Sequence, residues 1–353
     1  MRRNLLITGG AGFIGSNFIR YLFTKTDFDG IIVNFDKLTY AGNLYSLEDI
    51  QKNFKERYFF VKGDICDGMK VFETLKMYQI DTIVNFAAES HVDRSIYKPA
   101  DFIQTNVVGT FTLLECAREF WGNRTDVLFH HISTDEVYGS LTDEGQFTEE
   151  TPYNPRSPYS ASKAASDHLV MAYHHTYNLP VTLSNCSNNY GPYHFPEKLI
   201  PLIITNILEE KPLPIYGEVK NIRDWLYVED HARAIYLIIT KGKIGEKYNI
   251  GGGEEKTNLE VVNTICEKMA KKLGKDENHY KKLITFVKDR PGHDYRYSMN
   301  YEKIKRELGW EPSVTFNEGI ELTIDWYLKN RDWVEKVKSG EYQKWIEKNY
   351  LKR

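Results

Sequence analysis

Near its start the chain reads Leu5-Leu6-Ile7-Thr8-Gly9-Gly10-Ala11-Gly12-Phe13-Ile14-Gly15, a short apolar strand that runs into a helical pattern continuing to residue 23. Gly9, Gly12 and Gly15 have the spacing G-x-x-G-x-x-G, a variant of the loop that binds dinucleotide phosphates. The three glycines allow a tight turn, a close approach of the backbone to a pyrophosphate, and close packing of helix on strand. The free N–H groups at the start of the helix then face the phosphates. The stretch therefore predicts a strand–loop–helix unit that binds a dinucleotide.

An acidic residue, Asp36, follows the second apolar run at 31–35. It lies about 20 residues beyond Gly15, which is the interval typical of the acid that contacts the cofactor ribose. A carboxylate at this place accepts hydrogen bonds from the ribose hydroxyls and repels a 2′-phosphate. The position predicts NAD rather than NADP, with an ordinary turn carboxylate as the simpler alternative.

Apolar runs and helical patterns alternate along the first half of the chain. We expect strands at 5–7, 31–35, 58–62, 82–86, 127–132 and 181–185, and helices at 69–78, 99–121 and 157–177. Strands that alternate with helices form a parallel sheet wound on both faces. The sequence therefore predicts an α/β fold of the doubly wound, Rossmann type.

After Cys186 the pattern changes. A turn-rich loop at 187–193 precedes a helix that ends near 208, an extended segment at 212–217, and a strand at 221–228 that enters a helix. We expect residues 1–187 to form an NAD-binding domain to which the chain returns around 224–252. Residues 188–353 should form mainly a smaller, interwoven substrate-binding lobe. A solvated amphipathic helix is the simplest interpretation of the Lys- and Glu-rich tail after Asn330.

Two motifs in the middle of the chain carry groups suited to catalysis. Ser133-Thr134-Asp135-Glu136 places a hydroxyl and two carboxyls at the end of a buried strand. Tyr159-Ser160-Ala161-Ser162-Lys163 places a phenol and an ammonium four residues apart, on one face of a helix. Tyr-x-x-x-Lys alone is a weak signal. Downstream of a dinucleotide loop and a strand that ends in hydroxyl and acid, it indicates an active site built on a nicotinamide cofactor.

Each of these groups has a chemical task. Lys163 would lower the pKa of the Tyr159 phenol, which is ordinarily about 10, so that the phenolate takes a proton from a substrate hydroxyl as hydride leaves the same carbon. Thr134 can hydrogen-bond the same oxygen. A ketone acidifies the neighbouring C–H, so one of the carboxyls of Asp135 and Glu136 could remove that proton and the other could protonate a departing hydroxyl. The plainer alternative is that both carboxyls are solvated turn residues.

The composition argues against several other classes of function. The net charge is −3 and the pI about 6.4, whereas proteins that bind nucleic-acid backbones are usually basic. No apolar stretch approaches the roughly 20 residues of a membrane span, and the first strand begins so early that we expect no secretory signal. The four widely spaced cysteines favour reduced thiols in a cytoplasmic protein. The histidine pairs at 130–131 and 174–175, without H-E-x-x-H, give no reason to expect a metal.

Several segments resemble the nucleotide-sugar 4,6-dehydratases of the extended short-chain dehydrogenase/reductase family. The resemblance extends from about Leu5 to Trp326 and is carried by residues 8–15, 36–43, 87–95, 133–139, 159–163, 187–199, 222–232 and 290–294. The glycine loop and Tyr-x-x-x-Lys are shared by the whole superfamily, whereas 134–136 and 188–199 are far more selective. One departure is Tyr295, which precedes Arg296 where the family usually has two arginines.

The resemblance implies the removal of water from dTDP-glucose to give a 4-keto-6-deoxy sugar nucleotide, with NAD regenerated in each turnover. Tyr159 would be the base for oxidation at sugar carbon 4, assisted by Lys163 and Thr134. Glu136 would take the proton at carbon 5. Asp135 would protonate the hydroxyl that leaves carbon 6. The residues do not distinguish dTDP from UDP or CDP.

The resemblance also implies which residues bind the ligands. The expected cofactor-binding residues are Gly9, Gly12, Phe13, Ile14, Gly15, Asp36, Lys37, Leu38, Thr39, Asp64, Ile65, Ala87, Ala88, Ser90, Thr105, Tyr159, Lys163 and Asn189. The expected substrate-binding residues are Ser90, Thr134, Asn188, Lys198, Leu199, Pro214, Ile215, Tyr216, Arg223, Asn258, Asp289, Arg290, Pro291, Gly292 and His293. Lys198, Arg223 and Arg290 are the expected partners of the diphosphate.

Two other functions use some of the same features. A nucleotide-sugar 4-epimerase would need only Thr134, Tyr159 and Lys163, and would have no use for the adjacent acids. A non-catalytic protein that senses NAD would be expected to lack the tyrosine, the lysine or the acids, and this chain has all of them.

The helical pattern at 99–121 bears on assembly. Ile103, Val107, Phe111 and Leu114 form an apolar stripe along it. Packing in the core of one chain is the simplest interpretation. The sharper expectation is a homodimer through a four-helix bundle, in which each chain contributes this helix and the one at 157–177.

Overall fold

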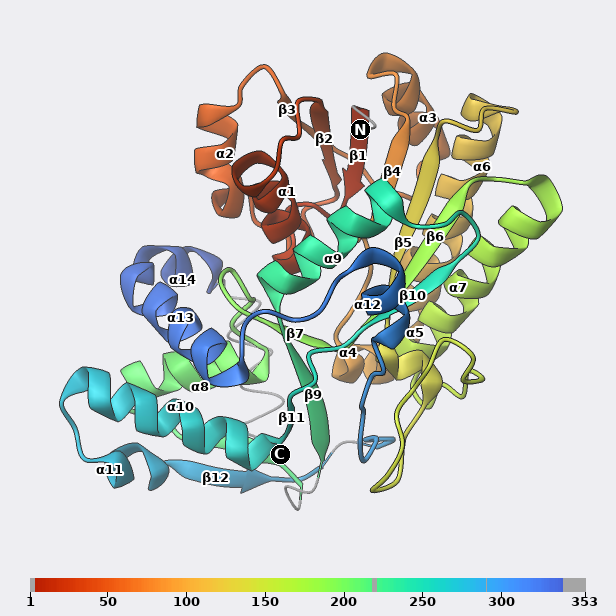
Figure 1. The fold of residues 1–353 in the computed structure, drawn as a ribbon. Coiled ribbons are helices and arrows are strands. Elements are labelled where there is room, and N and C mark those ends of the chain that lie inside the picture. The colour runs from red at the N-terminus through yellow and green to blue at the C-terminus, as the bar shows by residue number, and fades with distance from the viewer. Residues whose placement is uncertain (1–3, 218–220, 290, 339–353) are drawn as a thin grey trace.

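The computed structural model describes residues 4–217, 221–289 and 291–338, and its main element is a seven-stranded parallel sheet (Figure 1). The strand order is β10-β6-β5-β4-β1-β2-β3, so the winding direction reverses at β1. The predicted doubly wound Rossmann fold is confirmed. The strands are β1 (Asn4–Thr8), β2 (Ile31–Asp36), β3 (Tyr58–Lys62), β4 (Thr82–Asn85), β5 (Leu128–Thr134), β6 (Val181–Cys186) and β10 (Lys247–Ile250).

Helices cover both faces of this sheet because successive strand side chains point to opposite sides. On one face, Leu5 of β1 packs in a core with Phe18 and Ile235. These two residues belong to α1 (Phe13–Lys25) and α9 (Val228–Lys241). On the other face, Leu6 shares a core with Leu114. The helices on that face are α3 (Gly68–Met77), α6 (Thr110–Trp121) and α7 (Pro158–Tyr177).

A smaller lobe forms beside the carboxyl ends of the large sheet (Figure 1). Its helices α8 (Leu199–Leu208), α10 (Asn258–Leu273), α13 (Phe316–Lys329) and α14 (Arg331–Val337) share one hydrophobic core. Two small sheets accompany them, β11 (Glu255–Thr257), β9 (Ile222–Tyr227) and β7 (Asn188–Tyr190), and β12 (Ile284–Val287) with β8 (Leu213–Tyr216). After β7 and α8 of the smaller lobe, the chain returns to the large sheet, where α9 packs on one face and β10 forms an edge strand. The two parts are therefore interwoven. The boundary at 187 stays a prediction.

Short elements complete the described chain. The α-helices are α2 (Glu48–Asn53), α4 (Val92–Tyr97), α5 (Pro99–Phe102), α11 (Glu277–Lys281) and α12 (Glu302–Leu308). The tighter 3-10 turns are η1 (Leu44–Leu47) and η3 (Asp135–Tyr138), and η2 (Ile103–Gly109) is a π-helical segment.

Several predicted elements differ in detail from the structure. The helix predicted at 99–121 is divided into α5, the π segment η2 and α6. The predicted loop at 187–193 contains β7, which pairs in parallel with β9. The helix predicted to end near 208 begins only at Leu199. These differences arise from pairing and packing with distant segments, which local patterns do not reveal.

The tail after Asn330 is not a solvated helix where the structure describes it. In α14, Trp333, Val334 and Val337 are buried in the core of the smaller lobe. The Trp333 indole Nε1 also donates to Ser46 Oγ at 3.2 Å. The tail therefore closes the lobe over residues 331–337, and the rest of the predicted tail helix, 339–353, lies outside the described residues.

No helix of the described part of the chain has the length and apolar character to span a membrane. The cysteine thiols are free, and those of Cys116, Cys186 and Cys266 are buried.

Candidate active site

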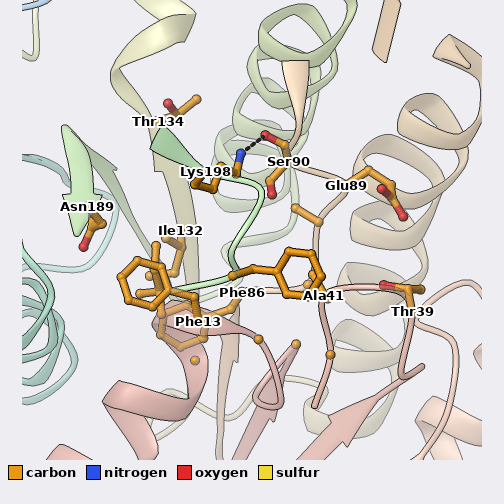
Figure 2. A pocket seen from close by; sticks show the side chains of 18 of the residues that line it. Phe13, Thr39, Ala41, Phe86, Glu89, Ser90, Ile132, Thr134, Asn189 and Lys198 are labelled. Carbon is orange, nitrogen blue, oxygen red and sulfur yellow. Dashed lines mark hydrogen bonds between the residues drawn. The ribbon is translucent and has the colours of Figure 1, made fainter. Parts of the chain in front are cut away.

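A cavity of about 380 Å³ lies at the carboxyl ends of β1, β2, β4, β5 and β6. Figure 2 shows Thr134 and Asn189 on one side of it and Glu89 and Ser90 on the other. Lys198 reaches across from the smaller lobe, and its ammonium donates to the Ser90 carbonyl oxygen at 3.4 Å (Figure 2). Ligands of doubly wound folds bind at this edge of the sheet, so the cavity is the candidate active site.

Most of the residues predicted to bind ligands line this one cavity, although their contacts with ligands stay predictions. The lining includes Gly9, Gly12, Phe13, Ile14, Gly15, Asp36, Lys37, Thr39, Asp64, Ile65, Ala87, Ala88, Ser90, Thr105, Thr134, Asp135, Glu136, Tyr159, Lys163, Asn188, Asn189, Lys198 and Leu199.

The glycine loop leaves its backbone open to the cavity. Gly9 has φ +66°, and a Cβ there would lie 2.7 Å from the Ala87 nitrogen. A Cβ at Gly15 would lie 2.5 Å from the Gly9 carbonyl oxygen. Gly12 caps the N-terminus of α1 without a side chain. The loop therefore fits a pyrophosphate, because unobstructed N–H groups and the positive end of a helix dipole face the place where it would lie.

Asp36 forms part of the cavity wall at the end of β2. Its Oδ2 accepts a hydrogen bond from the Ala11 N–H at 2.9 Å and its Oδ1 one from the Leu38 N–H at 2.8 Å. Burial raises the pKa of this carboxyl, and the two N–H donors oppose that shift. These bonds fix the carboxylate beside the glycine loop, where its further lone pairs suit a ribose diol. Nearby, Lys37 pairs with Asp64 at 2.7 Å.

The three residues after β5 form a tight turn at the cavity. Thr134 caps the 3-10 turn η3, where its Oγ1 accepts from the Glu136 N–H at 3.3 Å and donates to Asp135 Oδ1 at 3.1 Å. Asp135 is buried, and its Oδ2 has no hydrogen-bond partner among the described residues. Burial, with a further contribution from Glu136, raises the pKa of Asp135 well above its usual range. Burial therefore favours the protonated form of Asp135, next to a second carboxyl.

Tyr159 and Lys163 both line the cavity from the first turns of α7. A capping box between Ser157 and Ser160 starts the helix at this place. The Lys163 ammonium donates to the Ile132 carbonyl oxygen at 2.7 Å. The spacing predicted from the sequence thus brings phenol and ammonium to the same cavity.

The expected lowering of the Tyr159 pKa is wrong for this arrangement. Burial raises the pKa of the phenol well above its usual value, and the Glu136 carboxyl raises it further. The hydrogen bond with Thr134 acts in the opposite direction. Tyr159 therefore rests as a neutral phenol, because desolvation disfavours its anion.

The buried histidines near the cavity floor are neutral. Burial lowers the pKa of His130 to about 3 and that of His131 to about 4. Within the described residues, no group of three or more His, Cys, Asp and Glu side chains is arranged to hold a metal ion.

Part of the predicted substrate set lies outside the cavity lining, as does Leu38. The Arg223 guanidinium donates to the carbonyls of Ile222, Tyr295 and Asp294, at 2.7, 3.3 and 3.0 Å. Its assignment to the diphosphate stays a prediction. Arg290 lies outside the described residues. The other residues outside the lining are Pro214, Ile215, Tyr216, Asn258, Asp289, Pro291, Gly292 and His293.

Side chains that the sequence did not single out fix the walls of the cavity. Asn106 of η2 accepts from the Glu89 N–H at 2.8 Å, and donates to the Glu89 carbonyl at 3.0 Å and to Ser162 Oγ at 2.8 Å. Through these hydrogen bonds Asn106 links the turn after β4 to α7. Insertions of this π type are frequent at functional sites, but no pattern of residues reveals them.

A second cluster joins the two lobes beside the cavity. The Arg94 guanidinium lies 3.7 Å from the centre of the Tyr40 ring and donates to Glu197 Oε2 at 2.9 Å. Glu197 is buried and lies within the selective segment 188–199, which was the only sequence signal for it. Other lining residues that were not predicted are Phe35, Ala41, Gly42, Gly63, Phe86, Glu89, Ile132, Ser133, Cys186, Ser187, His194, Phe195, Ile200 and Trp225.

Known proteins match this chain in sequence and in fold. The family model described as GDP-mannose 4,6 dehydratase matches residues 6–323. A dTDP-glucose 4,6-dehydratase of Salmonella typhimurium is 57% identical over 360 residues, covering 98% of each chain. A crystal structure of dTDP-glucose 4,6-dehydratase from Bacillus anthracis, in complex with NAD, has 49% identity and a TM-score of 0.84, and covers 95% of this chain and 100% of that one.

Epimerases are more distant. A UDP-glucose 4-epimerase of Thermotoga maritima, solved with UDP-glucose, has 26% identity and a TM-score of 0.81, and covers 93% of this chain and 99% of that one. The Rossmann sheet, the glycine loop and the paired Tyr159 and Lys163 define an extended short-chain dehydrogenase/reductase. Within that class, the chain belongs to the dTDP-glucose 4,6-dehydratase family.

Proposed function

We propose that this chain catalyses the NAD-dependent dehydration of dTDP-glucose to dTDP-4-keto-6-deoxyglucose. The observation that carries the proposal is the turn at 134–136, which puts a buried carboxyl with a raised pKa and a second carboxyl in one cavity with Tyr159. A 4-epimerase has no need of such a pair. The relatives at high identity bear the name of this dehydratase, whereas the epimerase matches at 26%.

The residues divide into those for oxidation and those for elimination. The glycine loop and Asp36 would hold NAD, which would supply reversible hydride transfer between sugar carbons 4 and 6. Tyr159 takes the proton of the carbon-4 hydroxyl, with the Thr134 hydroxyl on the same oxygen and the Lys163 charge nearby. Because Tyr159 rests protonated, its phenol must first release its own proton to solvent. A positive charge close to the phenol oxygen would favour that release, and the phenolate could then accept the carbon-4 hydroxyl proton.

The two carboxyls of the η3 turn serve the elimination. Once carbon 4 is a ketone, the carbon-5 proton is acidic, and Glu136 removes it. Asp135, held neutral by burial, gives its proton to the oxygen that leaves carbon 6 as water. Unequal environments of two neighbouring carboxyls are the usual way in which one site supplies both an acid and a base.

The reaction is tested by incubating the protein with dTDP-, UDP- and CDP-glucose and identifying the products by mass spectrometry and NMR. We expect a 4-keto-6-deoxy sugar, formed most efficiently from dTDP-glucose. A product with an inverted carbon-4 hydroxyl would favour the epimerase, and no product from any of the three sugars would contradict the proposal.

The choice of cofactor is expected to depend on Asp36. The purified protein should carry or bind NAD, and NADP should support little activity, because the Asp36 carboxylate repels a 2′-phosphate. Asp36→Asn removes the charge and should narrow the preference for NAD over NADP. The cofactor extracted from the protein can be identified by mass spectrometry. NADP as the main species would contradict this expectation.

The assembly proposed here is a homodimer through α6, α7 and η2. Ile103, Phe111 and Tyr177 are 49%, 45% and 50% exposed on these elements, although Leu114 of the predicted stripe lies in the core. The helices α6 and α7 lie side by side in Figure 1, so their outer faces form one surface. A twofold contact between two copies would bury the exposed apolar side chains of both, which favours a homodimer.

Light scattering should give the mass of a dimer at micromolar concentration. Phe111→Glu should shift the protein toward monomer, since it would bury a charge in the contact. Leu322→Glu is the matched control, because Leu322 is an equally exposed residue on α13, in the other lobe. A wild-type protein that is monomeric would contradict the assembly.

We also propose a cytoplasmic location, which the free thiols favour.

A further inference from the structure

Asp167 is a buried carboxylate of α7, one helical turn beyond Lys163 and outside the lining of the active-site cavity. Its Oδ2 accepts hydrogen bonds from Ser133 Oγ at 2.7 Å, Tyr153 OH at 3.0 Å and Asn185 Nδ2 at 3.4 Å. Its Oδ1 makes no hydrogen bond among the described residues and lies 3.4 Å from His131 Nε2. Since burial of an unbalanced charge is costly, a nearby positive charge is expected.

Lys163 supplies the opposite charge. The residue is buried, and burial lowers the pKa of its ammonium. Asp167 is the charge that opposes this shift most strongly. Cys186, which acts in the same direction, has a thiol pKa raised to about 12 by burial and is therefore neutral. Asp167 therefore favours the charged form of Lys163.

His131 lies between the two charges but balances neither. Its Nε2 is 3.4 Å from Asp167 Oδ1 and 3.4 Å from Lys163 Nζ. It is neutral, as burial lowers its pKa to about 4. The other titratable groups that face the pair are Tyr138 of η3, Tyr153 of the loop before α7, Cys186 of β6 and Lys247 of β10. Lys247 lies in a separate open hollow on the outer side of Asp167.

We propose that Asp167 is a positioning residue that keeps Lys163 charged and anchors Ser133, the residue directly before the Thr134-Asp135-Glu136 turn. The proposal rests on the proposed function. Asp167 lies outside the lining of the active-site cavity, so it would act through Lys163 and Ser133 and would not contact a ligand itself. Its negative charge holds the proton on Lys163 at pH values where a lysine buried alone would lose it. Its hydrogen bond to Ser133 fixes the end of β5, from which the two catalytic carboxyls turn into the cavity.

The first test is Asp167→Asn, which keeps the shape and removes the charge. Dehydration of dTDP-glucose should fall about 10- to 100-fold in kcat, a loss like that seen when a group that orients a metal ligand is removed, with KM little changed. Removing a negative charge lowers the pKa of Lys163, so activity should be lost at a lower pH. The basic limb of the kcat profile should move down by about one pH unit or more. Tyr153→Phe is the control, because it removes one hydrogen bond to the carboxylate but keeps the charge, and its basic limb should stay.

The second test measures thermal unfolding and needs no substrate. In a cycle of Asp167→Asn, Lys163→Met and the double variant, the effects on Tm should be less than additive, because each single change leaves an unbalanced buried charge. If Asp167→Asn alone does not fold, the double variant should still fold. Additive effects, or a double variant that also fails to fold, would overturn the proposal. If the wild type makes no 4-keto-6-deoxy product, the proposed function fails, while the cycle still decides whether the two charges are coupled.

Discussion

Glu136→Gln should still oxidise the sugar at carbon 4 but should lose dehydration by about 100- to 10,000-fold, the range of a general base. The amide keeps the size and hydrogen bonding of the side chain but cannot accept the carbon-5 proton. With elimination blocked and oxidation intact, the bound cofactor should accumulate in its reduced form. Stopped-flow absorbance of the reduced nicotinamide, beside product formation, measures both effects in one experiment.

Asp135→Asn is the matched variant, since Asp135 is the other carboxyl of the same turn. It should also accumulate reduced cofactor, because the leaving hydroxyl has no proton donor. Unlike Glu136→Gln, it should still exchange the carbon-5 hydrogen with heavy water in sugar that is not dehydrated. Normal turnover by Glu136→Gln, or carbon-5 exchange in it at the wild-type rate, would show that Glu136 is not the base.

Tyr159→Phe should slow the first step itself, by about 100- to 10,000-fold, because the carbon-4 hydroxyl loses its proton acceptor. No reduced cofactor should accumulate, in contrast with Glu136→Gln. The pair of variants therefore separates oxidation from elimination by the presence or absence of the reduced-cofactor absorbance.

Tyr173→Phe is the control for this variant. Tyr173 is a buried residue of the same helix, with its hydroxyl 2.6 Å from Glu115 Oε1 and outside the cavity lining. It should leave both steps near the wild-type rate. A burst of reduced cofactor in Tyr159→Phe at the wild-type rate would mean that another group takes the proton.

The sequence predicted the sheet well because its strands are continuous apolar runs between turn signals. The run at 58–62 is β3 to the residue. The glycine loop predicted which end of the sheet binds ligands, and Ser133–Glu136 and Tyr159–Lys163 predicted which side chains meet there. All of these signals are local. They can be read from the sequence because side chains repeat with a fixed period along a helix or a strand.

What the sequence missed depends on tertiary contacts. The π segment η2 interrupts a regular helical pattern, and its Gly109 packs so closely on Ile65 that a Cβ would lie 2.5 Å from the Ile65 Cδ1. The strand β7 consists of Asn188, Asn189 and Tyr190, a run too short and polar to be recognised without its partner β9. In α14 the charged residues outnumber the apolar ones, so the sequence predicts a solvated helix, whereas Trp333, Val334 and Val337 are buried.

Electrostatics was the other limit. The spacing of Tyr159 and Lys163 is visible in the sequence, but the burial that raises the phenol pKa is not. Arg223 illustrates the same limit, since its guanidinium binds backbone carbonyls that are distant in sequence. The sequence shows where the charged residues stand along the chain. It does not show which groups contact them in the folded protein or how deeply they are buried.

The most direct test of the account is turnover of dTDP-glucose by the wild-type protein in heavy water, with the product analysed by NMR. Dehydration through Tyr159, Glu136 and Asp135 predicts deuterium at carbon 5, because the proton taken there exchanges with solvent before it is replaced. It also predicts that a hydrogen isotope placed at carbon 4 of the substrate appears at carbon 6 of the product. A product that keeps its original carbon-5 hydrogen, or that has only an inverted hydroxyl at carbon 4, would contradict it.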